Sequence, residues 1–119
     1  MNDAEKQQLI RRAYEAFNAR DVDAALQLMH ADVDWPNGME GGREHGRRAV
    51  RDYWTRQFTM IDSHVVPERV EVGDDGRVTV DVHQVVRDLD GNIVSDGHVQ
   101  HVYTFEDGLI AHMEIVPTT

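Results

Sequence analysis

The sequence predicts a single α+β domain over residues 1–119, with three N-terminal helices packed on a curved antiparallel sheet. Three observations lead to this fold class. Apolar residues recur at helical spacing only in the first half of the chain, whereas apolar and polar residues alternate after Ser63. The alternating runs are separated by Asp-Gly turn signals, which favour hairpins between neighbouring strands. A chain of 119 residues supports one hydrophobic core and leaves no stretch over for a linker.

Three segments have the spacing of amphipathic helices. The first covers residues 3–20, and the second covers residues 22–30 with Asp21 as its N-cap. The third begins near Arg47. The residues on or near one face are Leu9, Ile10, Ala13, Tyr14 and Phe17 in the first helix, Val22, Ala25, Leu26 and Met29 in the second, and Val50, Tyr53, Trp54, Gln57, Phe58 and Ile61 in the third.

Five runs are predicted to be strands. Residues 31–35 alternate between polar and apolar before the chain turns at residues 36–38, and residues 39–46 follow as a long, glycine-rich loop. Turn signals at residues 74–76, 89–92 and 106–108 divide the rest of the chain into four strands. Because these four are joined only by hairpins, we expect an antiparallel meander.

Alternation also predicts which side chains face the helices, because residues two apart share one face of a sheet. From residue 99 to residue 105 the odd-numbered positions are apolar or aromatic, so His101 and Tyr103 should face inward. The valines at 78, 80 and 82 form the inward set of the preceding strand, which places His83 on the outer face. The last strand, from Leu109 to Val116, is apolar on both faces. We therefore expect a homodimer that covers the outside of the sheet.

Composition excludes several classes of partner. The net charge is −10 and the pI is about 4.9, so nucleic acid and anionic membranes would be repelled. No apolar run approaches the roughly 18 residues of a membrane span. The chain has no cysteine, which removes disulfides and thiolate metal sites. Its N-terminus lacks the basic and apolar regions of a secretory signal, so we expect a cytoplasmic protein.

Four segments, in this order and spacing, resemble the nuclear transport factor 2-like superfamily, which includes ketosteroid isomerases and SnoaL-like polyketide cyclases. They are residues 17–23 (FNARDVD), 30–36 (HADVDWP), 46–54 (GRRAVRDYW) and 102–110 (VYTFEDGLI). The resemblance covers nearly the whole chain. It implies a cone-shaped α+β barrel around a pocket and dimers with sheets packed back to back. It says little about activity, because this fold hosts many functions.

The family's known chemistry transfers only in part. The proton-shuttling aspartate of the isomerases falls on Trp35, and their helix-one tyrosine falls on Ala13, one position from Tyr14. The acid/base aspartate of the cyclases corresponds to His101. Histidine exchanges a proton near neutral pH, so this position keeps a group suited to acid/base work. The Asp-Arg-Asp arrangement of limonene epoxide hydrolases has no counterpart that spacing identifies.

The candidate site therefore combines two catalytic residues with a wall of apolar ones. We expect His101 to act as a base and Tyr103 to donate a hydrogen bond to developing negative charge. The same His101 is equally consistent with a buried structural histidine bonded to Tyr103 or to a neighbouring strand. The predicted ligand-binding residues are Tyr14, Phe17, Trp35, Met39, Tyr53, Trp54, Phe58 and Met113. The alternative for each aromatic residue among them is that it belongs to the ordinary core.

Other kinds of site find less support in the spacing. His98 and His101 are three apart on one strand and point to opposite faces, while His83 and His101 are separated by parity, so we expect no metal site. Neither Ser63 nor Ser95 lies in a recognisable nucleophile turn. The loop over residues 39–46 is either a plain connection or a lid whose Arg43 or His45 reaches a polar end of the ligand.

Two hypotheses for function follow. The first is an isomerase, cyclase or dehydratase that uses no cofactor and moves a proton next to a carbonyl in a small apolar or polyketide-like molecule. The second is a non-catalytic domain of the same fold that binds a ligand or scaffolds a dimer.

Overall fold

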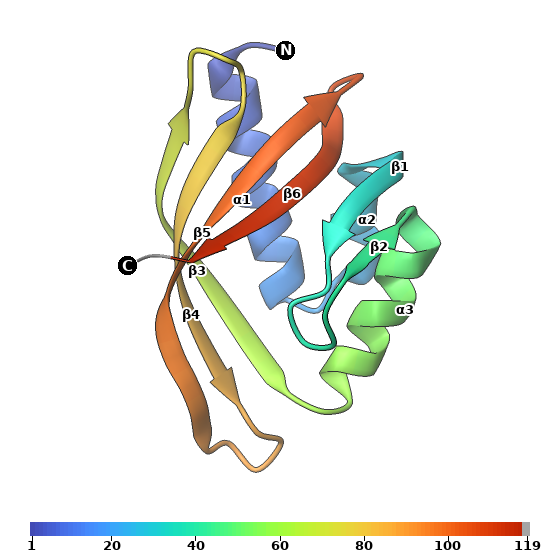
Figure 1. The fold of residues 1–119 in the computed structure, drawn as a ribbon, viewed down its shortest axis with the longest axis vertical. Coiled ribbons are helices and arrows are strands. Elements are labelled where there is room, and N and C mark those ends of the chain that lie inside the picture. Colours follow the sequence, from blue (N-terminus) through green and yellow to red (C-terminus); the bar gives the residue numbers. More distant parts are fainter. Residues whose placement is uncertain (118–119) are drawn as a thin grey trace.

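The computed structural model describes residues 1–117 and confirms the predicted fold class, three helices packed on a strongly curved sheet (Figure 1). In chain order the elements are α1 (Asp3–Asn18), α2 (Val22–Gln27), β1 (Met29–Pro36), β2 (Arg43–His45), α3 (Arg47–Phe58), β3 (Asp62–Val72), β4 (Val78–Arg87), β5 (Ile93–Glu106) and β6 (Leu109–Pro117). The six strands lie in the order β2-β1-β6-β5-β4-β3. The sheet does not close, so β2 and β3 are its edges.

The first two helices begin where capping side chains satisfy amide groups of their first turn. Asn2 and Glu5 form a capping box at the start of α1, and the Asp21 side chain accepts from the Ala24 amide at the start of α2. Gly46 precedes α3 at a φ of 85°, in the left-handed region that favours glycine. The Arg47 guanidinium then donates two hydrogen bonds to the Met29 carbonyl, which ties α3 to β1.

The second helix ends earlier than its apolar spacing predicts. It stops at Gln27, and Met29 and His30 already belong to β1. The Leu28 carbonyl accepts from the Ile110 amide at 2.9 Å, and Met29 pairs with Ile110 of β6. Pairing with a distant strand therefore overrides the local helical pattern.

The meander of β3 to β6 and its inward face match the sequence prediction. Val78, Val80 and Val82 are fully buried against the helices, and His101 and Tyr103 face the same side from β5. In β6 the register shift opposite residues 104 and 105 allows both Ile110 and Met113 to be buried. Together with the buried faces of the helices, these residues form one core.

Two features of the sheet differ from the expected arrangement. Residues 39–46 are not one long loop, because Arg43–His45 forms β2 and pairs antiparallel with β1. Strand β1 in turn pairs parallel with β6, so the sheet is not antiparallel throughout. Asn37-Gly38 after β1 is a hairpin signal, but the short β2 has no alternating pattern of its own, and the pairing of β1 with β6 joins segments far apart in the sequence.

The exposed edge of β3 is occupied by a side chain from α1. The side-chain amide of Asn18 donates to the backbone carbonyl of Val65 at 2.7 Å. The backbone N–H of Val65 donates to Asn18 Oδ1 at 3.0 Å. Further along β3, the register shifts between Pro67 and Arg69, so Glu68 is the extra residue of a β-bulge.

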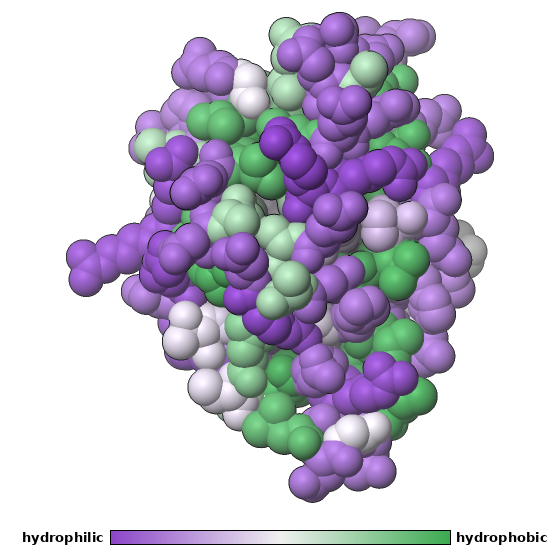
Figure 2. Space-filling model, turned by 180° about the vertical axis from the view of Figure 1, so that it is seen from behind, coloured by the Kyte–Doolittle hydropathy of each residue, from purple (hydrophilic) through white to green (hydrophobic). Residues whose placement is uncertain are grey.

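The face drawn in Figure 2 is mainly hydrophilic, in keeping with the net charge of −10. Figure 2 shows one face on which apolar residues lie in scattered patches between polar ones. Within residues 1–117, no helix has the length and apolar character needed to cross a bilayer.

Candidate functional site

A cavity of about 340 Å³ lies between the three helices and the concave face of the sheet. Seven of the eight predicted ligand-binding residues line it. They are Tyr14, Phe17, Trp35, Met39, Tyr53, Trp54 and Met113. Its size and largely apolar wall are those of a pocket for a small molecule.

The eighth predicted residue, Phe58, does not line this cavity. Its ring packs against Phe17 at a centroid distance of 5.5 Å, and the Arg20 guanidinium lies over both rings, 4.4 Å from the centre of Phe58 and 5.3 Å from that of Phe17. Phe58 therefore supports the wall and does not face a ligand.

The wall is held together by edge-to-face aromatic contacts. Trp54 meets Phe17 at 5.3 Å and Trp35 at 5.6 Å between ring centroids, with interplanar angles of 69° and 88°. Such contacts add to the stability gained by burying the rings. Trp54 is 3% exposed, so its indole is a buried part of the wall.

One wall of the cavity carries a chain of three polar side chains. The Tyr103 hydroxyl donates to the Tyr14 hydroxyl at 2.8 Å, and the Tyr14 oxygen lies 2.7 Å from His101 Nδ1. The partner of His101 is thus Tyr14 and not Tyr103, and the tyrosine hydroxyl next to the imidazole comes from α1. All three side chains are buried, and each lines the cavity.

Burial keeps these three groups uncharged at neutral pH. Removal from water lowers the pKa of His101 to about 4, because the imidazolium loses its hydration. Burial also raises the pKa of Tyr103, and burial together with the neighbouring Tyr103 raises the pKa of Tyr14. A neutral imidazole has one N–H donor and one acceptor nitrogen, so the Tyr14 contact permits two tautomers.

The two tautomers present different groups to the cavity. If Tyr14 donates to Nδ1, the proton of His101 lies on Nε2. If instead Nδ1–H donates to Tyr14, then Nε2 of His101 is an acceptor. In that state the Tyr14 oxygen accepts hydrogen bonds from both His101 and Tyr103, and its own O–H is available to a ligand. The second state offers a proton acceptor and a hydrogen-bond donor together.

A further group of polar side chains lines the cavity from α3, β3 and β4. The Gln57 side chain donates to the Tyr53 hydroxyl at 3.3 Å, and the Gln84 amide donates to Ser63 Oγ at 3.1 Å. Gln57 Oε1 is buried and has no hydrogen-bond partner within the described residues 1–117. A ligand donor would satisfy this oxygen. Sequence reasoning placed Gln57 near the apolar face of α3 but did not count it as a site residue.

The turn between β1 and β2 closes part of the cavity mouth. Gly38 and Met39 line the cavity, while the Asn37 side chain accepts from the Met39 and Glu40 amides and donates to Glu40 and Glu44. An ion pair between Glu40 and Arg56 at 2.9 Å joins the turn to α3 and lowers the pKa of Glu40.

The two residues proposed to reach a ligand from this segment point elsewhere. Arg43 donates to Asp34 Oδ1 at 2.5 Å and to the Met113 carbonyl at 2.5 Å. The His45 side chain is 73% exposed and lies 3.6 Å from Asp34. Neither residue lines the cavity, so the polar groups available to a ligand are those of the wall itself.

Three helices and one apolar cavity under a curved, unclosed sheet define the nuclear transport factor 2-like class of cone folds. Within that class the chain belongs to the SnoaL-like domain family, whose sequence profile matches residues 10–113. A sequence comparison with curated proteins gave no match.

Solved structures of similar proteins agree with this assignment. TerC co-crystallised with polyporic acid has a TM-score of 0.82 and 26% identity, covering 96% of this chain and 92% of TerC. A candidate polyketide cyclase from Xanthomonas campestris pv. campestris has a TM-score of 0.82 and 26% identity over 97% of this chain and 91% of its own. A Mycobacterium tuberculosis protein in complex with estradiol-17β-hemisuccinate shares the fold, with a TM-score of 0.80 and 18% identity over 93% and 92% of the two chains.

Proposed function

We propose that the protein binds a small, largely apolar carbonyl compound in its cavity and that His101 transfers a proton at the carbon next to the carbonyl. One observation carries the proposal. A neutral imidazole and a phenol hydroxyl, 2.7 Å apart, form a polar pair on the wall of an otherwise apolar cavity. This is the pairing of base and donor that proton abstraction next to a carbonyl requires.

In the proposed step His101 Nε2 accepts the proton while Nδ1–H donates to Tyr14. The C–H bond breaks, its electron pair forms the carbon–carbon double bond of an enolate, and the negative charge moves to the former carbonyl oxygen. The Tyr14 O–H donates to that oxygen. Return of the proton to another carbon completes an isomerisation. Although a pKa of about 4 makes His101 a weak base when the cavity is empty, the adjacent enolate would stabilise the imidazolium.

Tyr103 then acts through Tyr14 and not directly on the ligand. Its hydroxyl donates to Tyr14, which makes the Tyr14 O–H a stronger donor toward an oxyanion. The aromatic wall, with Trp35, Tyr53 and Trp54, would hold the apolar body of the ligand and exclude water. Gln57 Oε1 would accept from a hydroxyl or N–H group of the ligand.

Ligands of similar structures support the choice of compound class. TerC was crystallised with polyporic acid, and the Mycobacterium tuberculosis protein was solved with estradiol-17β-hemisuccinate. Each is a small molecule with rings and oxygen functions. We extend to this chain only the class that they share, a ring-containing apolar body with carbonyl or hydroxyl groups.

The binding part is tested by NMR of the histidine side chains during titration with each of these two compounds. A ligand in the cavity must shift the imidazole resonances of His101, while those of His64, exposed on β3, should stay in place. Saturable binding that leaves the His101 resonances unmoved would show that the ligand site lies elsewhere.

The catalytic part is tested by deuterium exchange at the acidic carbons of 2-tetralone, a small apolar ketone, in D₂O. The wild-type protein should accelerate exchange, and His101→Asn should lose the acceleration while the ketone still binds. His64→Gln is the matched control and should exchange like the wild type. Binding of the ketone with no acceleration by the wild type would favour the non-catalytic hypothesis, which the depressed pKa of His101 also fits.

We also propose that the chain forms a homodimer through the outer face of the sheet. Val116 on this face of β6 is 37% exposed, and Val66 on β3 is 43% exposed. Sedimentation at micromolar concentration should give about twice 13.6 kDa. A monomer under these conditions would refute the proposal.

A further inference from the structure

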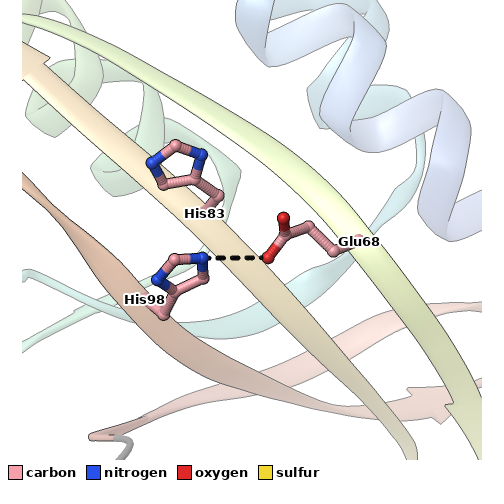
Figure 3. Close-up of side chains that lie close together, drawn as sticks. All are labelled: Glu68, His83 and His98. Carbon is pink, nitrogen blue, oxygen red and sulfur yellow. Dashed lines mark ion pairs between the residues drawn. The ribbon is translucent and has the colours of Figure 1, made fainter.

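Three side chains with metal-binding atoms meet on the outer face of the sheet, away from the cavity. They are Glu68 from β3, His83 from β4 and His98 from β5 (Figure 3). One ligand atom of each lies within 4.8 Å of the other two. The inward-facing neighbours on the same strands, such as Val82, belong to the core, so this cluster is separated from the proposed catalytic pair by the sheet itself.

The register of the sheet brings the two histidines together. His83 and His98 are directly opposite in the antiparallel pair of β4 and β5, and their rings stack with centroids 4.8 Å apart and an angle of 13°. Directly opposite residues have side chains that lie next to each other on one face. The two imidazoles therefore do not depend on a flexible loop for their approach.

The β-bulge in β3 supplies the third group. Glu68 is the extra residue between the paired Pro67 and Arg69, and bulges commonly redirect a side chain. Its carboxylate lies 3.1 Å from His98 Nε2, and one of its oxygens is directed at that ring in Figure 3.

A second carboxylate orients one of the rings. Asp96 Oδ1 lies 2.6 Å from His83 Nε2. An imidazole that donates its Nε2–H to a carboxylate keeps Nδ1 as an unprotonated acceptor. A carboxylate behind a ligating histidine is the usual support of a metal-binding imidazole, because it sets the tautomer and raises the basicity of the ligand.

We propose that Glu68, His83 and His98 bind one divalent transition-metal ion of the Zn²⁺ type. Two imidazoles and one carboxylate form a ligand set that suits Zn²⁺ and leaves a fourth position for water. His83 binds through Nδ1 and His98 through Nε2, with Asp96 as a positioning residue. Bonds of about 2.0–2.2 Å place tetrahedral ligands roughly 3.4 Å apart, and the ion must lie in the plane of each ring, so at least one ring must rotate out of the stacked arrangement to bind it.

A bound ion would join three neighbouring strands, β3, β4 and β5, on the face opposite the cavity.

The described residues contain one other cluster of this kind, His30 with Glu106 and Asp107. That cluster offers a single imidazole and two exposed carboxylates. Within residues 1–117, His30 has no further carboxylate behind its ring as Asp96 stands behind His83. It is therefore the natural competitor in the test.

The test is calorimetric titration of the full-length protein with Zn²⁺ after treatment with EDTA and its removal. We expect one ion per chain, and at least a tenfold weaker affinity in His83→Gln and in His98→Gln. The double variant should lose the site, and Asp96→Ala should weaken it about tenfold without removing a ligand. His30→Gln is the matched control and should bind like the wild type.

Three outcomes would overturn the proposal. The first is an affinity that does not change in the double variant, and the second is a loss of binding in His30→Gln. The third is half an ion per chain, which would place the ion between two copies. Nitrogen-15 NMR of the imidazoles provides an independent readout, because Zn²⁺ should shift Nδ1 of His83 and Nε2 of His98 and leave His101 unchanged. In the single chain His98 is exposed and His83 is half-buried, and neither belongs to the core, so all variants should keep the far-UV spectrum of the wild type.

Discussion

Lowering the pH should destabilise the protein through His101 in a defined window. The folded state holds this imidazole neutral with a pKa of about 4, against about 6.5 in the unfolded chain. Between these two values the unfolded chain binds a proton that the folded protein does not bind. The free energy of unfolding therefore falls as the pH drops below about 6.5, and the loss from this residue ends below about 4.

The size of the effect follows from the two pKa values. The contribution of His101 to stability decreases by about 2 kcal/mol between pH 7.5 and pH 5, and by about 3 kcal/mol at pH 4. Carboxyl groups such as Asp34 and Glu40, whose pKa values are lowered, also lose stabilising interactions in acid. Comparison with His101→Asn removes their share, because both proteins carry the same carboxyl groups.

The assay is urea unfolding followed by tryptophan fluorescence, with Trp35 and Trp54 as reporters in the cavity wall. The asparagine variant is less stable at pH 7.5, where it has lost a buried ring, but its disadvantage should shrink by about 2 kcal/mol at pH 5. If the difference in unfolding free energy between the two proteins stays constant from pH 7.5 to pH 5, the imidazole of His101 has the same pKa in the folded and the unfolded state. The reasoning from burial would then fail.

Three other substitutions, one of them with a control, test the packing and the backbone by the same unfolding assay. Tyr14→Phe removes the hydroxyl that joins two buried polar groups and should cost about 1–3 kcal/mol; no measurable cost would mean that water replaces it. Trp54→Ala should cost about 3–5 kcal/mol, unless the cavity wall collapses into the space. Gly46→Ala should cost about 1–2 kcal/mol because of its positive φ, whereas Gly97→Ala, with open space around the new methyl group, should change stability little. Equal effects at the two glycines would contradict the backbone argument.

Local patterns were sufficient for most of the fold. The alternation in β4 and β5 correctly placed Val80, His101 and Tyr103 on the inner face, and the Asp-Gly signals marked the hairpins. Strand β2 was missed because three residues after a glycine pair have no pattern of their own. They become a strand only because Asp34 and its neighbours lie opposite them. The parallel pairing of β1 with β6 was missed because its partners are about 80 residues apart.

The candidate site was predictable by residue type but not by contact. The inward direction of His101 follows from parity, yet its partner Tyr14 lies 87 residues away, and only the curvature of the sheet around α1 brings them together. Gln57 carries no sequence signal, since a polar residue beside an apolar helix face is usually solvated. The outward positions of both His83 and His98 also follow from parity. Their direct pairing depends on the register of β4 and β5. The prediction of no metal site rested on whether His98 shares a face with His101 and not on whether it lies opposite His83.

The Asn18 side chain on the edge of β3 bears on how readily this edge could pair with another chain. An eleven-residue edge strand presents free amide and carbonyl groups to any extended chain that approaches it. Here the backbone N–H and carbonyl of Val65 are already hydrogen-bonded to the Asn18 side chain, which takes the place of a neighbouring strand. Two residues on, Pro67 offers no N–H, and the bulge at Glu68 interrupts the flat repeat that a cross-β stack needs. The edge is long but has no uninterrupted segment of the six or seven residues typical of amyloid templates.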